Sequence, residues 1–268
     1  MLLDVEAQVL RNTRLSPDFN IITLAAPEIA ALARPGQFVM VKSSRGNDPL
    51  LRRPFSIFEI IRHQSGIEGF SLLSKRVGAT TRMLFDAVAG DLISCLGPLG
   101  RPFDPADPPA AAWMVAGGVG LAPFATLAEA LRERGTSTTL FYGARSAREL
   151  FYLDWFTARG VRVVLTTEDG SLGERGRITA PLERELQQAP GNVMVYACGP
   201  EPMLEAVSSV AGKYGKPTQV SVERVMGCGM GGCYSCVIPV REPGGGRHYV
   251  RSCIAGPVFV GADVVWDH

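Results

Sequence analysis

Short runs of alternating hydrophobic and polar residues fill the first hundred positions of the chain. Six runs have the length and two-residue period of half-buried strands, and glycine or proline separates them. These runs are residues 6–12, 19–26, 36–43, 54–62, 66–74 and 90–97. One interruption, 75–88, spaces Met83, Leu84 and Val88 for a short helix. Several short strands at regular spacing predict a small antiparallel β-barrel.

The pattern changes after a proline-rich connection at 101–112. The connection is followed by an apolar run at 113–116 and a glycine turn at 117–123. Apolar residues then recur at i, i+3, i+4 and i+7 from Phe124 and predict a helix, and Pro123 fits the first turn of that helix. Further strands are predicted at 138–144, 161–167, 192–198 and 218–223, and helices at 147–156, 178–186 and 200–212. Strands that alternate with helices predict a parallel sheet, which binds ligands at the carboxyl ends of its strands.

We therefore expect a multidomain α+β and α/β protein. The expected parts are an N-terminal antiparallel β-barrel (1–104), a parallel-sheet α/β domain (105–222) and a small cysteine-rich unit (223–268). Residues 108–128 carry no charge, but glycines and a proline interrupt them, so a membrane span is not expected. A net charge of +1 gives no reason to expect nucleic-acid binding, and the N-terminus does not read as a signal peptide, so we expect a cytoplasmic protein.

Four cysteines near the C-terminus carry the strongest chemical signal. Residues 227–236 read GCGMGGCYSC, so that Cys228, Cys233 and Cys236 form a C-x4-C-x2-C pattern followed by the distant Cys253. This spacing is that of plant-type 2Fe–2S sites, whereas zinc ribbons usually pair two C-x2-C motifs. Glycines let such a loop turn its N–H groups towards sulfur. We favour a 2Fe–2S cluster, with zinc or a purely structural role as alternatives. The two remaining cysteines are not expected to be ligands.

Three further motifs are weaker when each is taken alone. In RRPFSI (52–57) an arginine, a ring and a hydroxyl could meet a flavin dinucleotide, or the arginine could simply be a surface residue. In AGGVGLAP (116–123) the glycines could admit a phosphate to a helix N-terminus, or form only a turn. In ACGPEPML (197–204) Cys198 would lie at the mouth of the binding crevice near a nicotinamide ring, or be a small buried side chain.

These motifs, in this order, resemble the ferredoxin–NADP reductase superfamily over nearly the whole chain. The short tail that carries the cysteines is similar to that of the electron-transfer subunits of NAD-linked (type B) dihydroorotate dehydrogenases, and TTEDGSLGERGRIT (166–179) resembles the same subgroup.

The resemblance implies a role for each motif residue. It implies that FAD is bound by Arg53, Pro54, Phe55, Ser56, Gly78 and Thr81, and that NAD(H) is bound by Gly117, Gly118, Gly120, Pro123, Gly199 and Pro200, with Cys198 at the reacting end. It implies that the metal ligands are Cys228, Cys233, Cys236 and Cys253. Two positions depart from the family pattern: Thr80 stands where glycine is usual, and Phe55 replaces the usual tyrosine, which keeps stacking but loses a hydroxyl.

The implied activity is an oxidoreductase relay. Electrons would pass from NADH to FAD, which converts a hydride into single electrons, then to the cluster and to a separate FMN-containing catalytic subunit in a heterotetramer. There dihydroorotate would become orotate, in pyrimidine biosynthesis. No histidine constellation is evident, since His63, His248 and His268 are scattered.

Two alternatives remain at this point. One is the reductase subunit of another complex, of the NADH-dependent ferredoxin:NADP oxidoreductase or hydrogenase type, in which Arg145 and Ser146 could bind the 2′-phosphate of NADP. The other is a zinc-binding module without redox function.

Overall fold

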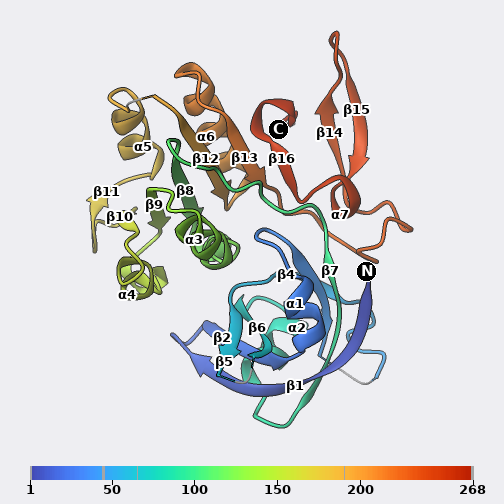
Figure 1. Ribbon diagram of the computed structural model, residues 1–268. Coiled ribbons are helices and arrows are strands. Elements are labelled where there is room, and N and C mark those ends of the chain that lie inside the picture. Colours follow the sequence, from blue (N-terminus) through green and yellow to red (C-terminus); the bar gives the residue numbers. More distant parts are fainter. Residues whose placement is uncertain (1, 44–45, 65, 190, 267–268) are drawn as a thin grey trace.

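The N-terminal part of the protein is a curled, entirely antiparallel sheet (Figure 1). The computed structural model describes residues 2–43, 46–64, 66–189 and 191–266. The seven strands follow the order β4-β3-β7-β1-β2-β6-β5. They are β1 (Leu3–Arg14), β2 (Phe19–Ala25), β3 (Phe38–Lys42), β4 (Arg53–Ser56), β5 (Ile60–His63), β6 (Gly66–Lys75) and β7 (Leu92–Leu99), with helices α1 (Pro27–Leu32) and α2 (Ala79–Asp86).

The single strand expected at 54–62 is in fact two strands, and the break between them curls the sheet. β4 and β5 are the two edges of the sheet and are consecutive in the chain. In the short segment between them, Phe58 N donates to Ser71 O (2.9 Å), and Ser71 N donates to Glu59 O (2.9 Å). These bonds tie the connection to β6, so the ends of the sheet approach each other as a half-barrel. The predicted antiparallel architecture is confirmed.

Helix α2 is present where the sequence predicts a helix, but its buried face differs. Thr80, Leu84 and Phe85 are buried, whereas Met83 and Val88 are exposed. The reason lies on β1, where the Nδ2 of Asn12 donates to the carbonyl oxygens of Leu84 (2.9 Å), Phe85 (3.1 Å) and Ala87 (2.8 Å). This side chain fixes the rotation of the helix end, which hydrophobic spacing alone does not determine.

The second sheet is parallel except at one edge and follows the order β11-β10-β9-β8-β12-β13-β16. Its strands are β8 (Ala111–Gly117), β9 (Thr138–Ala144), β10 (Arg162–Thr167), β11 (Glu174–Arg175), β12 (Val193–Cys198), β13 (Thr218–Ser221) and β16 (Val258–Val260). The helical elements are η1 (Gly118–Leu121), α3 (Phe124–Glu133), η2 (Ala147–Glu149), α4 (Leu153–Thr157), α5 (Thr179–Leu186) and α6 (Glu201–Lys213). The uncharged segment 108–128 thus forms the predicted strand, turn and helix. Within the described ranges, no helix combines the length and apolarity needed to span a membrane.

The helix expected at 147–156 is interrupted at Tyr152, which has a left-handed backbone (φ 62°). A tertiary interaction explains the interruption. The Tyr152 hydroxyl donates to Glu59 Oε2 (3.1 Å), and its ring packs edge-on against Phe58 at 4.8 Å. Both partners belong to the half-barrel, so this break joins the two sheets.

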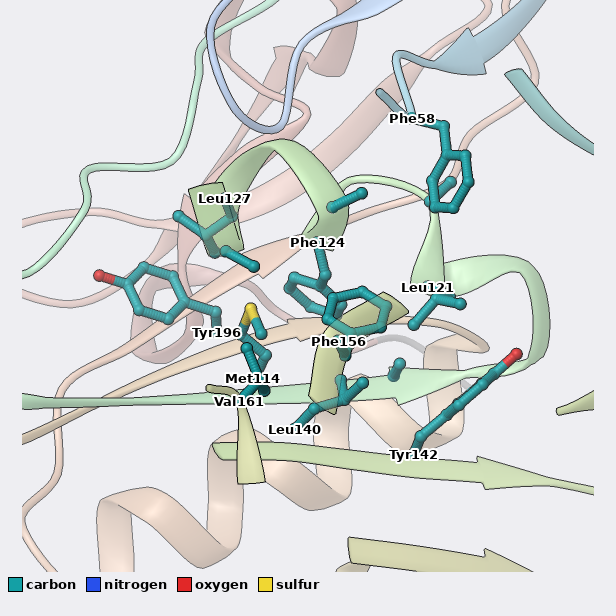
Figure 2. Packing of buried hydrophobic residues seen from close by; sticks show 14 of the residues in the cluster. Phe58, Met114, Leu121, Phe124, Leu127, Leu140, Tyr142, Phe156, Val161 and Tyr196 are labelled. Atoms are coloured by element: carbon teal, nitrogen blue, oxygen red, sulfur yellow. The ribbon is translucent and has the colours of Figure 1, made fainter. Parts of the chain in front are cut away.

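One hydrophobic core crosses from the half-barrel into the parallel sheet. It contains Phe58 and Phe103 together with Leu121, Phe124 and Tyr142. Figure 2 shows Phe58, Leu121 and Phe124 in this shared cluster. The two sheets are therefore packed directly against each other.

The C-terminal unit contacts both sheets. It contains the hairpin β14 (Val237–Arg241) and β15 (Arg247–Arg251), the short helix α7 (Ser252–Ala255), strand β16 and the turn η3 (Gly261–Asp263). The tip of the hairpin projects away from the rest of the chain (Figure 1), whereas Ile238 and Val240 of β14 are buried against the parallel sheet. β16 pairs antiparallel with β13 and so extends the parallel sheet.

Candidate functional site

The four predicted ligand cysteines come together at the base of the C-terminal unit. Cys236 and Cys253 are almost fully buried, Cys228 is half-buried and Cys233 is exposed. The thiols of Cys228 and Cys233 interact, as do those of Cys236 and Cys253, and Cys228 also acts electrostatically on Cys253. The chain thus joins a loop and a helix 17 residues apart, Cys236 to Cys253, into one sulfur-rich site.

The surroundings of these thiols fit an iron–sulfur cluster. The backbone N–H groups of Met230 and Gly232 donate to Cys228 Sγ, at 3.4 and 3.3 Å, which is the kind of sulfur contact expected of a cluster loop. Within the described residues, no three His, Cys, Asp or Glu side chains are arranged around a single metal ion. A two-iron cluster does not need that arrangement, because each iron takes two of the four thiolates.

The charge of the donor set also calls for a cation. Burial, together with the neighbouring Cys236, raises the pKa of Cys253 to about 12. Hydrogen bonding with Ser235 lowers the pKa of Cys233 to about 6, and the two side chains lie 3.1 Å apart. Cys253 is therefore a thiol at neutral pH. Holding all four cysteines as thiolates requires positive charge, which bound iron would supply.

The cysteine loop packs directly on the half-barrel. Met226, Cys236 and Cys253 share a buried cluster with Phe38 and Met40 of β3. The alternate residues Val39 and Val41 of the same strand point into the interior of the half-barrel. Strand β3 therefore separates that interior from the cysteine site.

The predicted flavin motif forms strand β4, directly beside β3. Met40 pairs with Pro54, and Val39 pairs with Phe55. The guanidinium of Arg53 is exposed and donates only to nearby backbone oxygens, those of Leu51 (3.2 Å) and Arg52 (3.1 Å). No carboxylate in the described part of the chain pairs with it. It is thus available to an anionic ligand, and the motif fits a flavin dinucleotide.

The neighbouring Arg52 is already engaged. Its Nη2 lies 2.8 Å from Asp4 Oδ1 and 2.9 Å from Ser94 Oγ. The structure therefore distinguishes two adjacent arginines that the sequence presents together: one is part of the scaffold and the other faces solvent.

Gly78 and Thr81 form the N-terminus of α2. Thr81 Oγ1 accepts from the backbone N–H groups of Val77 (2.9 Å) and Gly78 (2.8 Å). The hydroxyl thus organises the first turn, whose own N–H groups suit a phosphate. A hollow of about 660 Å³ lies beside this helix, with Met83 and Asp91 among its lining residues.

The two predicted nicotinamide-cofactor motifs meet at the carboxyl ends of adjacent strands. β8 ends at Gly117 and β12 ends at Cys198. A β-carbon on Gly120 would lie 2.1 Å from Cys198 O, and one on Gly117 would lie 2.9 Å from Pro200 Cδ. Only glycine permits this approach. Pro123 is the N-cap of α3, one position before the helix proper, and follows the turn directly.

Cys198 lies at the crevice between these loops. Its thiol is desolvated, which raises the pKa to about 12, and it interacts with Ser221, its partner on β13. At neutral pH this side chain is a thiol that packs and donates weakly, and not a thiolate nucleophile. Cys95, the other cysteine outside the pattern, is buried in the core of the half-barrel.

Neither of the two described histidines lies in either site. His63 pairs with Glu68 (2.9 Å), and His248 lies 3.5 Å from Glu242 on the projecting hairpin. His268 lies outside the described residues.

Sequence reasoning missed two residues of this site. Met40 reads as an ordinary strand residue, and Glu149 as an ordinary helix residue. Only the pairing of strands shows that Met40 lies between two motifs, and the segment after β9 brings Glu149 against Arg145. The proximity of Glu149 to Arg145 in sequence, at i and i+4, is the one signal that could have indicated the second contact.

Two family models match the chain. Residues 114–209 match the oxidoreductase NAD-binding domain. Residues 223–265 match the iron–sulfur cluster binding domain of dihydroorotate dehydrogenase B. The second match covers all four cysteines of the proposed cluster.

Curated relatives match along nearly the whole chain. The dihydroorotate dehydrogenase B (NAD(+)) electron transfer subunit of Desulforamulus reducens is 36% identical, over 98% of both chains. Those of Geobacillus thermodenitrificans and Fusobacterium nucleatum are 37% and 33% identical, over 91% and 97% of both chains.

Solved structures share the fold. That of the NADH-dependent reduced ferredoxin-NADP oxidoreductase superposes with a TM-score of 0.85 at 28% identity, over 98% of this chain and 90% of that one. The Neisseria gonorrhoeae ferredoxin NADP+ reductase with bound FAD and NADP has a TM-score of 0.62 at 20% identity, over 79% of this chain and 92% of that one.

Proposed function

Because this chain belongs to the family of electron-transfer subunits of NAD(+)-dependent dihydroorotate dehydrogenase B, we propose that it relays electrons between NADH and a separate FMN-containing catalytic subunit. FAD and a 2Fe–2S cluster are the resident groups, and the assembly is a heterotetramer. When bound, FAD exchanges a hydride with nicotinamide and single electrons with the cluster. Oxidation of dihydroorotate releases two electrons, so during that reaction the relay runs from the partner towards NAD⁺, opposite to the direction expected from the sequence. With NADH as the donor, the partner would reduce orotate instead.

The observation that carries this proposal is the packing of the cysteine loop on β3. Gly229, beside Cys228, lies against Met40, and Met40 pairs with Pro54 in the flavin motif. One strand therefore separates the two redox motifs. The exposure of Cys233 leaves one side of the cysteine site open to a partner.

The residues of the half-barrel hold the flavin. Arg53 and the first turn of α2 bind the phosphates, while Phe55, which is partly buried against the half-barrel core, and Ser56 bind the ring system. A phenylalanine at this position stacks without contributing a hydroxyl. The half-barrel supplies orientation and charge to the flavin.

The residues of the parallel sheet hold the nicotinamide cofactor. The turn at Gly117–Gly120 admits its phosphates, and Cys198, Gly199 and Pro200 receive its nicotinamide end. The strand order β12-β8-β9 supports this assignment. With the nicotinamide at β12 and the phosphates at β8, the adenosine ribose would lie at β9.

Anaerobic titration of the reconstituted chain with NADH tests this function. We expect the flavin to bleach, and we expect orotate-linked turnover only after the catalytic subunit is added. Oxidation of dihydroorotate by the isolated chain alone would contradict the division of labour. As a control, the same preparation without the catalytic subunit should oxidise NADH with ferricyanide as the acceptor, which shows that electron transfer within the chain is intact.

A further inference from the structure

An ion-pair cluster lies at the end of β9, where the adenosine ribose of the nicotinamide cofactor is expected. Gly143 of β9 pairs with Gly117 of β8, so Arg145 lies just beyond the glycine turn. In open parallel sheets the residue at the end of this neighbouring strand distinguishes the two cofactors: a carboxylate binds the ribose 2′-hydroxyl of NAD, and an arginine accepts the 2′-phosphate of NADP. This chain places both side chains there.

Both carboxylate oxygens of Glu149 accept hydrogen bonds from the guanidinium of Arg145. Arg145 Nε lies 3.2 Å from Glu149 Oε2, and its Nη2 bonds to Glu149 Oε1. Only 15% of the Glu149 side chain is exposed, against 67% of Arg145. The carboxylate is thus the fixed member of the pair, and the arginine is the one that could reorient towards a ligand.

A second cation holds the carboxylate in place. Lys75 Nζ, at the end of β6 in the half-barrel, lies 3.1 Å from Glu149 Oε1. Pairing with Arg145, and then with Lys75, lowers the pKa of Glu149 to about 2, so that it is ionised at neutral pH.

Further carboxylates lie near Arg145. Glu168 acts electrostatically on its guanidinium. The next residue, Asp169, donates its backbone N–H to Arg145 O (3.2 Å), and its carboxylate accepts from the hydroxyl of Ser171. The same hydroxyl accepts a hydrogen bond from Ala147 N (2.8 Å). This bond holds the loop that contains Glu168 and Asp169 against the start of η2.

We propose that Glu149 makes the chain selective for NADH over NADPH by sequestering Arg145. This inference rests on the proposed function, because it concerns the same nicotinamide site. A 2′-phosphate would have to break the two-point Arg145–Glu149 pair and lie near carboxylates, whereas a 2′-hydroxyl can donate to a carboxylate and leave the pair in place. Selectivity thus comes from repulsion of the wrong cofactor as much as from contact with the right one.

Binding of nucleotide fragments to the full-length, FAD-loaded chain tests this proposal. The probes are 2′,5′-ADP, which carries the 2′-phosphate, and 5′-AMP, which lacks it, with dissociation constants measured by calorimetry. We expect Glu149→Gln to raise the preference for 2′,5′-ADP over 5′-AMP by about 10-fold, because the released Arg145 can then bind the 2′-phosphate. The ratio of NADPH to NADH kcat/KM with ferricyanide should rise in parallel.

Three further variants separate this role from a structural one. The double variant Arg145→Ala/Glu149→Gln should return the preference to that of the wild type. Lys75→Met removes the second cation on Glu149 but leaves Arg145 paired, so it should change the preference less than Glu149→Gln does. Arg145→Ala alone, at an exposed site, should change the wild-type preference less than about 2-fold, because the arginine is already sequestered.

Specific outcomes would overturn the inference. An unchanged preference in Glu149→Gln, a raised preference that survives in the double variant, or a large loss of preference in Arg145→Ala would each do so. If instead the wild-type chain failed to oxidise NADH with ferricyanide, the proposed function itself would fail and this inference with it. NADH oxidation with an unchanged preference contradicts the inference alone.

Discussion

Gly229 and Met40 are packed so closely that a β-carbon on the glycine would lie 2.5 Å from Met40 Cγ. Gly229 also has a left-handed backbone, with φ of 72°. The contact seats the cysteine loop on β3, one strand from the RPFS motif. Proximity of the two redox motifs therefore depends on a residue without a side chain.

The variant Gly229→Ala tests whether the contact with Met40 positions the cysteine loop. The left-handed backbone and the clash with a fully buried methionine should together lower the free energy of unfolding by about 2 kcal/mol or more. Iron content should fall while FAD content is retained. Gly232→Ala is the matched control, because a β-carbon there has no neighbour within 4 Å and the backbone N–H to Cys228 remains. Equal iron loss in both variants would contradict the role given to Met40.

The two adjacent arginines should behave differently. Arg53→Gln should weaken FAD binding by roughly 10- to 100-fold, the effect of losing a hydrogen bond to a charged group, with little change in stability. Arg52→Gln should leave FAD binding intact and lower the free energy of unfolding by about 1 kcal/mol or less, since it removes a surface pair with Asp4. Fluorescence titration of the apoprotein with FAD measures the first effect, and urea unfolding the second. If Arg52→Gln weakened FAD binding and Arg53→Gln did not, the assignment of the flavin to Arg53 would be wrong.

Cys233→Ser should stop delivery to the partner subunit but leave reduction of the flavin by NADH largely intact. The reason is that the serine hydroxyl is a poor ligand for cluster iron, whereas the nicotinamide crevice at Cys198 lies on another element. Stopped-flow absorbance follows the first step, and orotate-linked turnover the second. Cys95→Ala, in the core of the half-barrel, is the control that should keep its iron. Loss of both steps in Cys233→Ser would mean that the cluster is needed for folding.

Glu59 should make stability depend on pH. Burial raises the pKa of its carboxyl above the usual 4.5, although hydrogen bonds from Tyr152 and Trp155 oppose this. The folded state then binds more protons than the unfolded state, so the free energy of unfolding should fall as pH rises from about 4.5 through the folded pKa. Glu59→Gln should flatten this part of the profile, and Tyr152→Phe should steepen it. Urea unfolding between pH 4.5 and 8 measures the slopes, and identical profiles in all three proteins would exclude Glu59 as the source.

The sequence predicts the two sheets and most of their elements, because hydrophobic period and glycine placement are local signals. Where it fails, a distant residue decides. Asn12 sets which face of α2 is buried, and Glu59 with Phe58 draws Tyr152 into the left-handed backbone that breaks the helix at 147–156. Neither contact alters the hydrophobic periodicity of the segment whose structure it changes.

The candidate site follows the same division. The four cysteines and the glycine turn are predictable, since their chemistry restricts residue type and spacing. The Met40–Gly229 contact and the sequestered Arg145 are not, because they depend on strand pairing and on rotamers that the fold imposes. The addition of β16 to the edge of the parallel sheet is likewise invisible in a three-residue segment.

The most direct test of the account is paramagnetic resonance of the anaerobically reconstituted chain after addition of NADH alone. We predict about two irons per chain and a reduced 2Fe–2S signal that appears with NADH and is lost in Arg53→Gln protein from which FAD has been removed. A signal that appears with dithionite but never with NADH would break the proposed relay. Absence of iron would contradict the central claim.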